Sequence, residues 1–229
     1  MVAALHRGGE VTWLPVDAGD PEAADAVEPI KQPALASGRA LISAARAGEA
    51  REALEALGRF RLLCAHRRGP HGVSTWTQRQ QTWLVDEFDD LDLERRDYVG
   101  RPLLVTENDY ELGLYNGDTG VIVEHATGSP MAMFERAGEL LSFSPLRLGA
   151  VETVYAMTIH KSQGSQFDTA AVLLPPADSP ILTRELLYTA VTRARRQLIL
   201  IGTEATVRAA VTRPVSRASG LRRRLWSAS

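Results

Sequence analysis

The chain has 229 residues, of which 45% are hydrophobic and 24% charged, and its formal net charge is −2. This composition is typical of a soluble globular protein and excludes a wholly disordered chain, a collagen and a coiled coil. No apolar run approaches the roughly 20 residues that cross a bilayer, and the first residues lack the basic start and apolar core of a secretion signal. We therefore expect a cytoplasmic protein without a membrane partner, built as one large domain or as a medium domain with an insert.

The cysteine content limits the chemistry further. Cys64 is the only cysteine, which excludes an internal disulfide framework and a thiolate zinc cluster, and we predict no metal site on the protein. Because Cys64 lies within an apolar run, we expect a small buried side chain rather than a nucleophile. The slightly acidic charge means that any nucleic-acid contact must come from a local arrangement of groups.

The first part of the chain is loosely patterned, and we predict a connector or partly ordered segment over residues 1–36. Val11–Val16 could form a short edge strand, because a proline is tolerated only at a sheet edge. Asp17–Pro33 is rich in Pro, Ala, Asp and Glu, which favours a loop or a partly disordered connector. A helical spacing of apolar residues begins at Ser37 and ends near Gly58.

The middle of the chain changes character twice. A short buried strand over Arg61–Ala65 is followed by a loop, His66–Gly72, and by a predicted helix from about Ser74 to Phe88. Several closely spaced, strand-like runs then lie between residues 98 and 150, separated by turn sequences. This pattern predicts a small β-barrel or meander that is inserted into the main domain. The runs are 103–105, 121–123, 131–134 and 140–143.

After the insert, apolar strands alternate again with helical patterns. Strands are predicted over 152–157, 169–174 and 198–202, with a helix from about Thr183 to Arg195. Such apolar strands are typical of a parallel sheet that is covered by helices on both faces. The predicted fold is therefore α/β, with the main domain over 37–97 and 151–212, the insert over 98–150 and a basic tail over 213–229.

A polar loop from Thr158 to Gln166 separates two of these apolar strands. Ligands of open α/β sheets bind beyond the carboxyl ends of the strands, and Thr158 directly follows a predicted strand. Hydroxyl, imidazole, ammonium and amide groups provide many hydrogen-bond donors and few acids, which suits phosphates. Composition alone is equally compatible with a solvated loop.

The helix predicted from Thr183 to Arg195 carries the second polar group of residues. Thr183 can cap it, and an apolar stripe that includes Leu186 and Ala190 would face the sheet. Arg193 and Arg196 fall on another side of the helix. Arginines near a helix C-terminus also have a purely structural explanation, because they interact favourably with the helix dipole.

Taken together, these two segments resemble the last two motifs of superfamily 1 DNA helicases, and specifically those of the RecD family, the alpha chain of exodeoxyribonuclease V. The resemblance runs from about Arg61 to the end of the chain. It implies the second RecA-like motor domain, carrying an inserted SH3-like β-barrel. Supporting segments are 67–73, 101–102, 108–109, 112–120 and 219–221.

The resemblance also implies a nucleotide-binding half of the site. Arg193 matches the catalytic arginine that reaches the γ-phosphate of ATP bound between two motor domains. Gly164 and Gln166 match positions that meet the sugar and phosphates of the nucleotide. The family usually has Glu where this chain has Gln166, whose amide can still form a hydrogen bond with a ribose hydroxyl. Arg79 is a weaker candidate for a second phosphate contact, and a plain surface arginine explains it better.

The DNA-binding half follows from the same motif. Thr158 and His160 correspond to the side of the motif that grips the backbone of single-stranded DNA. Lys161, Ser162 and Gln163 complete the loop that couples this side to the nucleotide. In the inserted barrel, Tyr110 or Tyr115 could stack on a base, although buried or surface packing is the favoured explanation. The run Arg222–Arg224 is interpreted as a solvated tail rather than a DNA clamp.

One expected element is missing from these residues. The sequence contains no Gly-x-x-x-x-Gly-Lys-[Ser/Thr] loop to cradle phosphates and position Mg²⁺, and no apolar strand ends in the acidic pair that would hold that metal. In the family both lie in the first motor domain. The resemblance therefore implies that ATP and Mg²⁺ are held mainly by a first motor domain absent from this chain, and that the chain alone does not hydrolyse ATP.

Three hypotheses follow for the function. The first is the C-terminal motor domain of a 5′-to-3′ helicase that repairs double-strand breaks together with RecB and RecC. The second is a non-catalytic module that binds single-stranded DNA or docks on RecB and RecC. The third is a part of a stand-alone RecD-like helicase.

Overall fold

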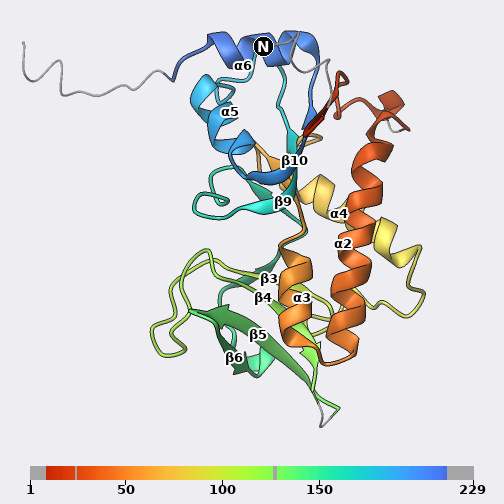
Figure 1. Cartoon of the computed structure of the whole chain (residues 1–229), viewed down its shortest axis with the longest axis vertical. Coiled ribbons are helices and arrows are strands. Elements are labelled where there is room, and N and C mark those ends of the chain that lie inside the picture. Colours follow the sequence, from red (N-terminus) through yellow and green to blue (C-terminus); the bar gives the residue numbers. More distant parts are fainter. Residues whose placement is uncertain (1–8, 24, 126–127, 216–229) are drawn as a thin grey trace, which may run out of the picture.

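The computed structural model describes residues 9–23, 25–125 and 128–215, which form two five-stranded sheets (Figure 1). All strands of the first sheet run parallel to their neighbours. In spatial order this sheet contains β1 (Val11–Leu14), β10 (Ala194–Ile201), β9 (Phe167–Leu173), β2 (Phe60–Cys64) and β8 (Ala156–Thr158).

The second sheet is antiparallel and lies at the other end of the molecule (Figure 1). The short strands predicted between residues 98 and 150 are confirmed as members of this sheet. Its own apolar cluster includes Leu103, Ile122 and Phe134. In order it contains β6 (Glu139–Phe143), β5 (Pro130–Arg136), β4 (Thr119–Glu124), β3 (Pro102–Val105) and β7 (Val151–Thr153).

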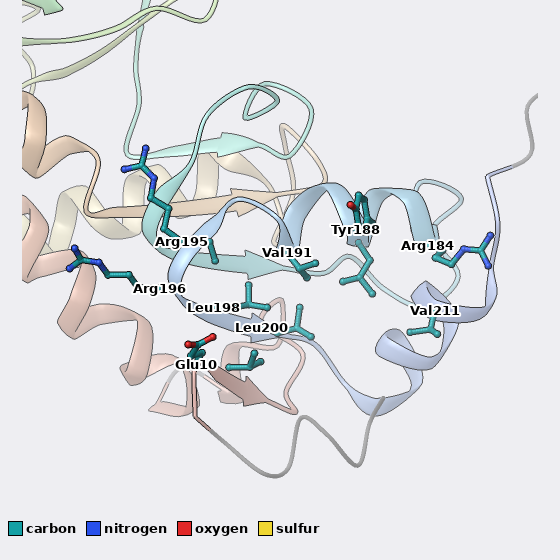
Figure 2. Close-up of a pocket in the computed structure, with 12 residues that line it drawn as sticks. Glu10, Arg184, Tyr188, Val191, Arg195, Arg196, Leu198, Leu200 and Val211 are labelled. Atoms are coloured by element: carbon teal, nitrogen blue, oxygen red, sulfur yellow. The ribbon is translucent and has the colours of Figure 1, made fainter. Parts of the chain in front are cut away.

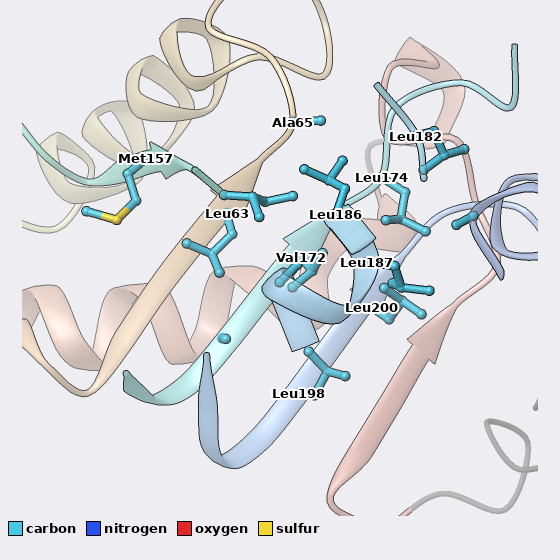
Figure 3. Close-up of a cluster of buried hydrophobic side chains, with 14 of the residues drawn as sticks. Leu63, Ala65, Met157, Val172, Leu174, Leu182, Leu186, Leu187, Leu198 and Leu200 are labelled. Carbon is cyan, nitrogen blue, oxygen red and sulfur yellow. The ribbon is translucent and has the colours of Figure 1, made fainter. Parts of the chain in front are cut away.

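Helices cover both faces of the parallel sheet, as predicted. Helices α5 (Arg184–Val191) and α6 (Glu204–Thr212) pack on the face that carries Leu63, Val172 and Leu200 (Figure 3). Helices α2 (Glu28–Arg46) and α4 (Val73–Val85) pack on the opposite face, which carries Leu62 and Leu173. Successive residues of each strand point to opposite faces, so a strand that is apolar throughout fits between two helical layers.

Helix α2 also connects the two sheets. Its first half packs Ile30 and Ala34 on the parallel sheet. Its second half packs Leu41 and Ile42 in a cluster with Val121 and Val123 of β4, together with helix α3 (Ala50–Leu57). The apolar core is therefore continuous along one long helix, which runs beside both sheets (Figure 1).

The N-terminal part of the chain is more ordered than predicted. The edge strand is confirmed as β1, but the connector predicted over Asp17–Pro33 is wrong from Glu28 onward, where α2 begins instead of at Ser37. Pro29 lies in the first turn, where a missing N–H costs no hydrogen bond. Burial of Ile30 and Ala34 stabilises the early turns despite Pro33 inside the helix. Short 3₁₀ turns, η1 (Pro21–Ala23) and η2 (Asp25–Val27), precede it.

Two further boundaries differ from the prediction. The predicted strand over 152–157 is two strands in different sheets, β7 and β8, separated by Val154 and Tyr155. The helix predicted to Arg195 ends at Val191, and β10 begins at Ala194 rather than at Leu198. The physical reason is pairing across the sheet, because Ala194 lies opposite Phe167 and the Phe167 N–H donates to the Arg193 carbonyl at 2.8 Å.

The remaining segments lie at the surface or outside the described part. A 3₁₀ turn, η3 (Pro145–Arg147), follows β6. The run Arg222–Arg224 of the predicted basic tail lies outside the described residues. In the described ranges, no helix is long and apolar enough to cross a membrane.

Candidate functional site

The polar loop between β8 and β9 runs from one edge of the parallel sheet to the other. Thr158 lies level with Cys64 at the carboxyl ends of the strands, and Cys64 lies level with Leu173. Phe167, where the loop ends, is six residues before Leu173 on the same strand, which corresponds to about 20 Å at ~3.3 Å per residue. The predicted site residues therefore form two groups at opposite edges of the sheet.

The first group surrounds a cavity of about 300 Å³ at the carboxyl edge, where the two sheets meet. Thr158 and Lys161, both predicted to bind DNA, line it. The Thr158 hydroxyl accepts a hydrogen bond from the Lys161 N–H at 3.2 Å, which fixes the first turn of the loop. The Lys161 ammonium is 2.8 Å from Oε2 of Glu152 on β7, so the second sheet holds this loop by an ion pair.

Five more polar residues line the same cavity and were not identified from the sequence. They are Arg67, Ser74, Thr77, Glu152 and Thr153. The Thr77 hydroxyl oxygen is buried and has no hydrogen-bond partner, which is uncommon for a polar atom inside a protein. Arg67 belongs to a segment that the resemblance includes, but its position in the sequence does not predict that it lines the same cavity as Lys161. Only the tertiary fold brings the loop after β2 to the loop after β8.

The other three residues of the predicted DNA-binding set lie differently. Ser162 is fully buried, and its hydroxyl donates to the Ile159 carbonyl at 2.7 Å, so it stabilises the turn from within. His160 and Gln163 are exposed at the surface of the loop. The loop can therefore present two side chains outward while Ser162 holds its shape.

The second group lies at the amino edge of the sheet. Gly164 has a φ of +89°, in the left-handed region that favours glycine, and no atom lies within 4 Å of the position that a Cβ would take. Gln166 is exposed beside it. Arg193 follows the C-terminal end of α5 and reaches this part of the loop.

Arg193 is tied to the loop by its own hydrogen bonds. Its Nη1 group donates to the Ser165 carbonyl at 2.9 Å and to the Ser162 carbonyl at 3.4 Å. Its Nε group donates to the Thr189 carbonyl at 3.0 Å, and Nη2 donates to the Thr192 hydroxyl at 3.1 Å. The guanidinium therefore links α5 to the loop, so a movement of either one changes the position of the other.

Arg79 does not join either group through a direct contact. Its guanidinium carbon lies 4.8 Å from the centre of the Trp76 ring on the same helix. Among the described residues, its side chain makes no hydrogen bond or ion pair. This geometry is a cation–π contact on a helix surface, which has a structural explanation of its own.

Two tyrosines of the second sheet region were candidates for base stacking. Tyr110 and Tyr115 are exposed, with ring centres 6.3 Å apart in an edge-to-face arrangement. The cavity beside Tyr110 is lined by three carboxylates, from Glu107, Asp109 and Glu111. Carboxylates repel the phosphates of a nucleic acid, so the surroundings of this pair do not favour base stacking.

The described residues contain no group of three or more His, Cys, Asp or Glu side chains that could hold a metal ion. Both edges of the sheet are instead rich in hydrogen-bond donors. Lysine, arginine, hydroxyl and amide groups of this kind bind phosphate oxygens well. The arrangement suits two phosphate-bearing ligands, one at each end of a single loop.

The chain is similar in sequence to known helicase proteins. A family model described as the UvrD-like helicase C-terminal domain matches residues 153–201. The RecBCD enzyme subunit RecD of Mycolicibacterium smegmatis is 49% identical over 225 residues, which are 98% of this chain and 38% of that protein. The RecBCD enzyme subunit RecD of Mycobacterium tuberculosis (strain H37Rv) is 54% identical over 187 residues, which are 82% of this chain and 32% of that protein.

The chain thus spans about a third of the length of these relatives. Among solved structures, one that describes DNA unwinding at forked double-stranded DNA by two coordinating Pif1 helicases matches with a TM-score of 0.41 and 16% identity. That match covers 87% of this chain and 52% of the other.

Proposed function

Because the chain belongs to the RecD family and matches a C-terminal part of its longer members, we propose that it forms the second RecA-like motor domain of a RecD helicase subunit. The antiparallel sheet would be the SH3-like barrel that is inserted in this domain. The observation that carries the proposal is the loop from Thr158 to Gln166, whose two ends lie at opposite edges of the sheet with phosphate-binding groups at each.

At the amino edge, the proposed ligand is ATP. Arg193, Gln166 and the open space at Gly164 fit phosphates and a ribose hydroxyl, whereas the described part of the chain holds no group of three or more His, Cys, Asp or Glu side chains that could bind Mg²⁺. The metal and most phosphate contacts would therefore be supplied by a first motor domain. To reach a γ-phosphate, Arg193 exchanges loop carbonyls for phosphate oxygens, and its charge then stabilises the transition state of phosphoryl transfer.

At the carboxyl edge, the proposed ligand is the backbone of single-stranded DNA. A DNA phosphate entering the cavity beside Thr158 competes with Glu152 for the Lys161 ammonium. Arg67 supplies a second positive charge there. The Lys161 ammonium lies 2.8 Å from the Glu152 carboxylate of the second sheet. Binding of DNA would therefore break this ion pair and change the contact between the loop and that sheet.

The two edges are coupled by one continuous loop. When Arg193 leaves the Ser162 and Ser165 carbonyls for the nucleotide, the loop loses one hydrogen bond at its middle and one near its far end. Thr158 and Lys161 start the same loop, so their position depends on the nucleotide state. In the full-length protein, this coupling would drive 5′-to-3′ translocation with RecB and RecC during the repair of double-strand breaks in the cytoplasm.

Substitution of Arg193 in the full-length protein tests the nucleotide half. We expect Arg193→Ala to lower DNA-stimulated ATP turnover by about a thousandfold or more, because the transition-state charge loses its partner. Arg208→Ala is the matched control, since Arg208 is an exposed arginine on α6 that pairs with Glu204. Circular dichroism checks that both variants fold. Retained turnover in a folded Arg193→Ala protein would contradict the assigned role.

A second experiment tests the division of labour between domains. Purified as these 229 residues, the chain is expected to show no ATP turnover with or without single-stranded DNA. Addition of the remaining part of a RecD protein should restore it. Clear DNA-stimulated turnover by the 229 residues alone would mean that they contain a complete nucleotide site, and the half-motor proposal would be wrong.

A further inference from the structure

A second large cavity lies beside α5 and β10, and none of the predicted site residues lines it. Its volume is about 490 Å³, and it is enclosed by α5, α6, β10 and the edge strand β1 (Figure 2). Its floor consists of Leu187, Leu198 and Leu200, which belong to the core of the parallel sheet. Val191 and Val211, both partly exposed, form its walls. The hydrophobic core of the sheet therefore reaches the surface at this point.

The rim of this cavity is positively charged. Arg184, Arg195 and Arg196 line it, against a single carboxylate from Glu10. Figure 2 shows Arg195 and Arg196 at one end of the cavity and Arg184 at the other. Arg195 forms no ion pair within the described part of the chain, and the pairs of the other two are long, at 3.6 and 3.9 Å, and exposed. Such pairs contribute little, so these cations remain available to another anion.

Two more features favour a protein ligand at this place. Tyr188 is 69% exposed beside the apolar floor, and tyrosine and arginine are the residues most often found at the energetic centre of protein interfaces. In addition, β1 begins to pair with β10 only at Leu198. Within the described residues, Ala194–Gln197 therefore have no neighbouring strand on that side, which is the kind of strand edge that an extended segment can extend.

The two undescribed ends of this chain are a poor electrostatic match for the rim. Residues 1–8 and 216–229 contain five arginines and no Asp or Glu. Bringing either end to a rim of three arginines and one carboxylate would place like charges together, which costs free energy. A ligand that complements the rim must carry carboxylates.

We propose that this cavity is a docking site for an acidic, apolar segment of a partner protein. The segment inserts two or three apolar side chains over Leu187, Leu198 and Leu200, and its flanking carboxylates pair with Arg184, Arg195 and Arg196. The apolar contact supplies most of the affinity, and the arginines select a segment of the right charge.

Photo-cross-linking from the cavity tests this directly. Tyr188 is replaced by p-benzoylphenylalanine in the full-length protein assembled with its partner subunits, and cross-linked peptides are identified by mass spectrometry. The proposal predicts a cross-link to a partner peptide that carries apolar residues flanked by at least two carboxylates. The same replacement at Tyr110, which is exposed in the second sheet region, is the control and should not give this peptide.

Charge reversal at the rim provides the second measurement. Arg195→Glu combined with Arg196→Glu should lower the cross-link yield by about tenfold, since two rim charges of up to ~1 kcal/mol each are lost. Arg208→Glu on α6 makes the same kind of change outside the cavity and should leave the yield unchanged. The proposal is overturned by a cross-link to this chain itself, to a second copy or to a peptide without carboxylates, and by no cross-link at all.

The experiment uses a complex with partner subunits, and this use rests on the proposed function. ATP turnover of the same preparation is therefore measured in parallel. A complex that turns over ATP but gives none of the predicted cross-link contradicts the docking site alone. A complex that gives the cross-link without turnover contradicts the helicase proposal alone.

Discussion

Arg61 is a buried arginine that has no acidic partner among the residues that the structure describes. It is 2% exposed, and its guanidinium donates to the carbonyls of Leu57, at 3.1 Å, and of Val154. It also lies over the Phe167 ring, 5.2 Å from its centre. Burial lowers the pKa of Arg61 to about 10, so the side chain still carries its charge at neutral pH. One residue thus joins α3, the junction between the sheets and the start of β9.

Loss of this side chain should destabilise the whole protein. We expect Arg61→Ala to lower the free energy of unfolding by about 3 kcal/mol, because two buried carbonyls lose their donor and a cavity remains. Arg59→Ala, two residues away and exposed, should change it by less than about 0.5 kcal/mol. Urea denaturation measures both. Equal effects of the two substitutions would contradict the structural role of Arg61.

Cys64 offers a prediction about reactivity. It is fully buried, and desolvation raises the pKa of its thiol to about 12, so almost no thiolate forms at pH 8. The folded protein should therefore react with a disulfide reagent such as dithionitrobenzoate only when it unfolds. Addition of urea should release one thiol per chain. Rapid reaction of the native protein at pH 8 would show that Cys64 is reachable by solvent.

At the scale of elements, local sequence patterns predicted the strands and helices but not all of the residues at which they begin and end. The helical spacing of apolar residues continues through Ala194, so nothing local ends the helix at Val191. The helix ends because the Phe167 N–H donates a hydrogen bond to the Arg193 carbonyl. These two residues are far apart in the sequence, so a short-range pattern cannot predict their contact. Local patterns also did not predict the cavity beside Lys161, because Arg67 and Thr77, which line it, lie in a different part of the sequence.

Gly120 in β4 is required by the packing of the second sheet. A Cβ at this position would lie 2.6 Å from Cε1 of Phe134 and 2.7 Å from the Met133 carbonyl oxygen. Gly120→Ala should therefore cost on the order of 2–3 kcal/mol through overpacking of the β4–β5 pair. Gly149→Ala is the control, since no atom lies within 4 Å of its Cβ position. Thermal unfolding of both variants measures the difference, and equal melting temperatures would contradict this account.

The connection between the two sheets should be sensitive to high pH. The hydroxyl groups of Tyr98 and Tyr155 are 3.0 Å apart in the core, and burial raises the pKa of Tyr98 to about 12 and that of Tyr155 well above its ordinary value. A pKa that is higher in the folded state gives stability that is complete below the unfolded value of about 10 and lost as the pH rises above it.

We therefore expect the free energy of unfolding to fall between about pH 10 and pH 12, with a slope of up to ~1.4 kcal/mol per pH unit for each tyrosine. Urea denaturation at several pH values measures this slope. The double variant Tyr98→Phe/Tyr155→Phe has no such groups and should show a flatter profile. A profile that is unchanged in the double variant would assign the loss of stability to other groups.

At the scale of the whole molecule, the sequence predicted two layers of structure around a parallel sheet, and the fold confirms them. It did not predict that α2 begins at Glu28 and spans both sheets. The reason is that Pro29 and Pro33 make the local sequence typical of a loop. The helix forms nevertheless, because burial of Ile30 and Leu41 on two different sheets stabilises it. The division of the site residues between the two edges of the sheet also depends on the order of the strands, and local sequence patterns do not predict that order.

Because α2 packs on both sheets, the two should unfold together. Hydrogen exchange measured by mass spectrometry can compare β5 (Pro130–Arg136) with β9 (Phe167–Leu173). Amides in both strands should show the same free energy of opening under conditions where exchange reports equilibrium opening. Markedly weaker protection of β5 would show that the second sheet opens independently and that α2 does not couple the two.

The pairing of β1 with β10 has a consequence for how the protein is made. During synthesis, β1 (Val11–Leu14) leaves the ribosome well before its parallel partner β10 (Ala194–Ile201). At roughly 5–20 residues per second, translation leaves β1 waiting on the order of ten seconds or more before its partner exists. Throughout that interval Trp13 and Leu14 lack the strand with which they pair in the folded protein, so their backbone and apolar side chains remain uncovered until β10 emerges.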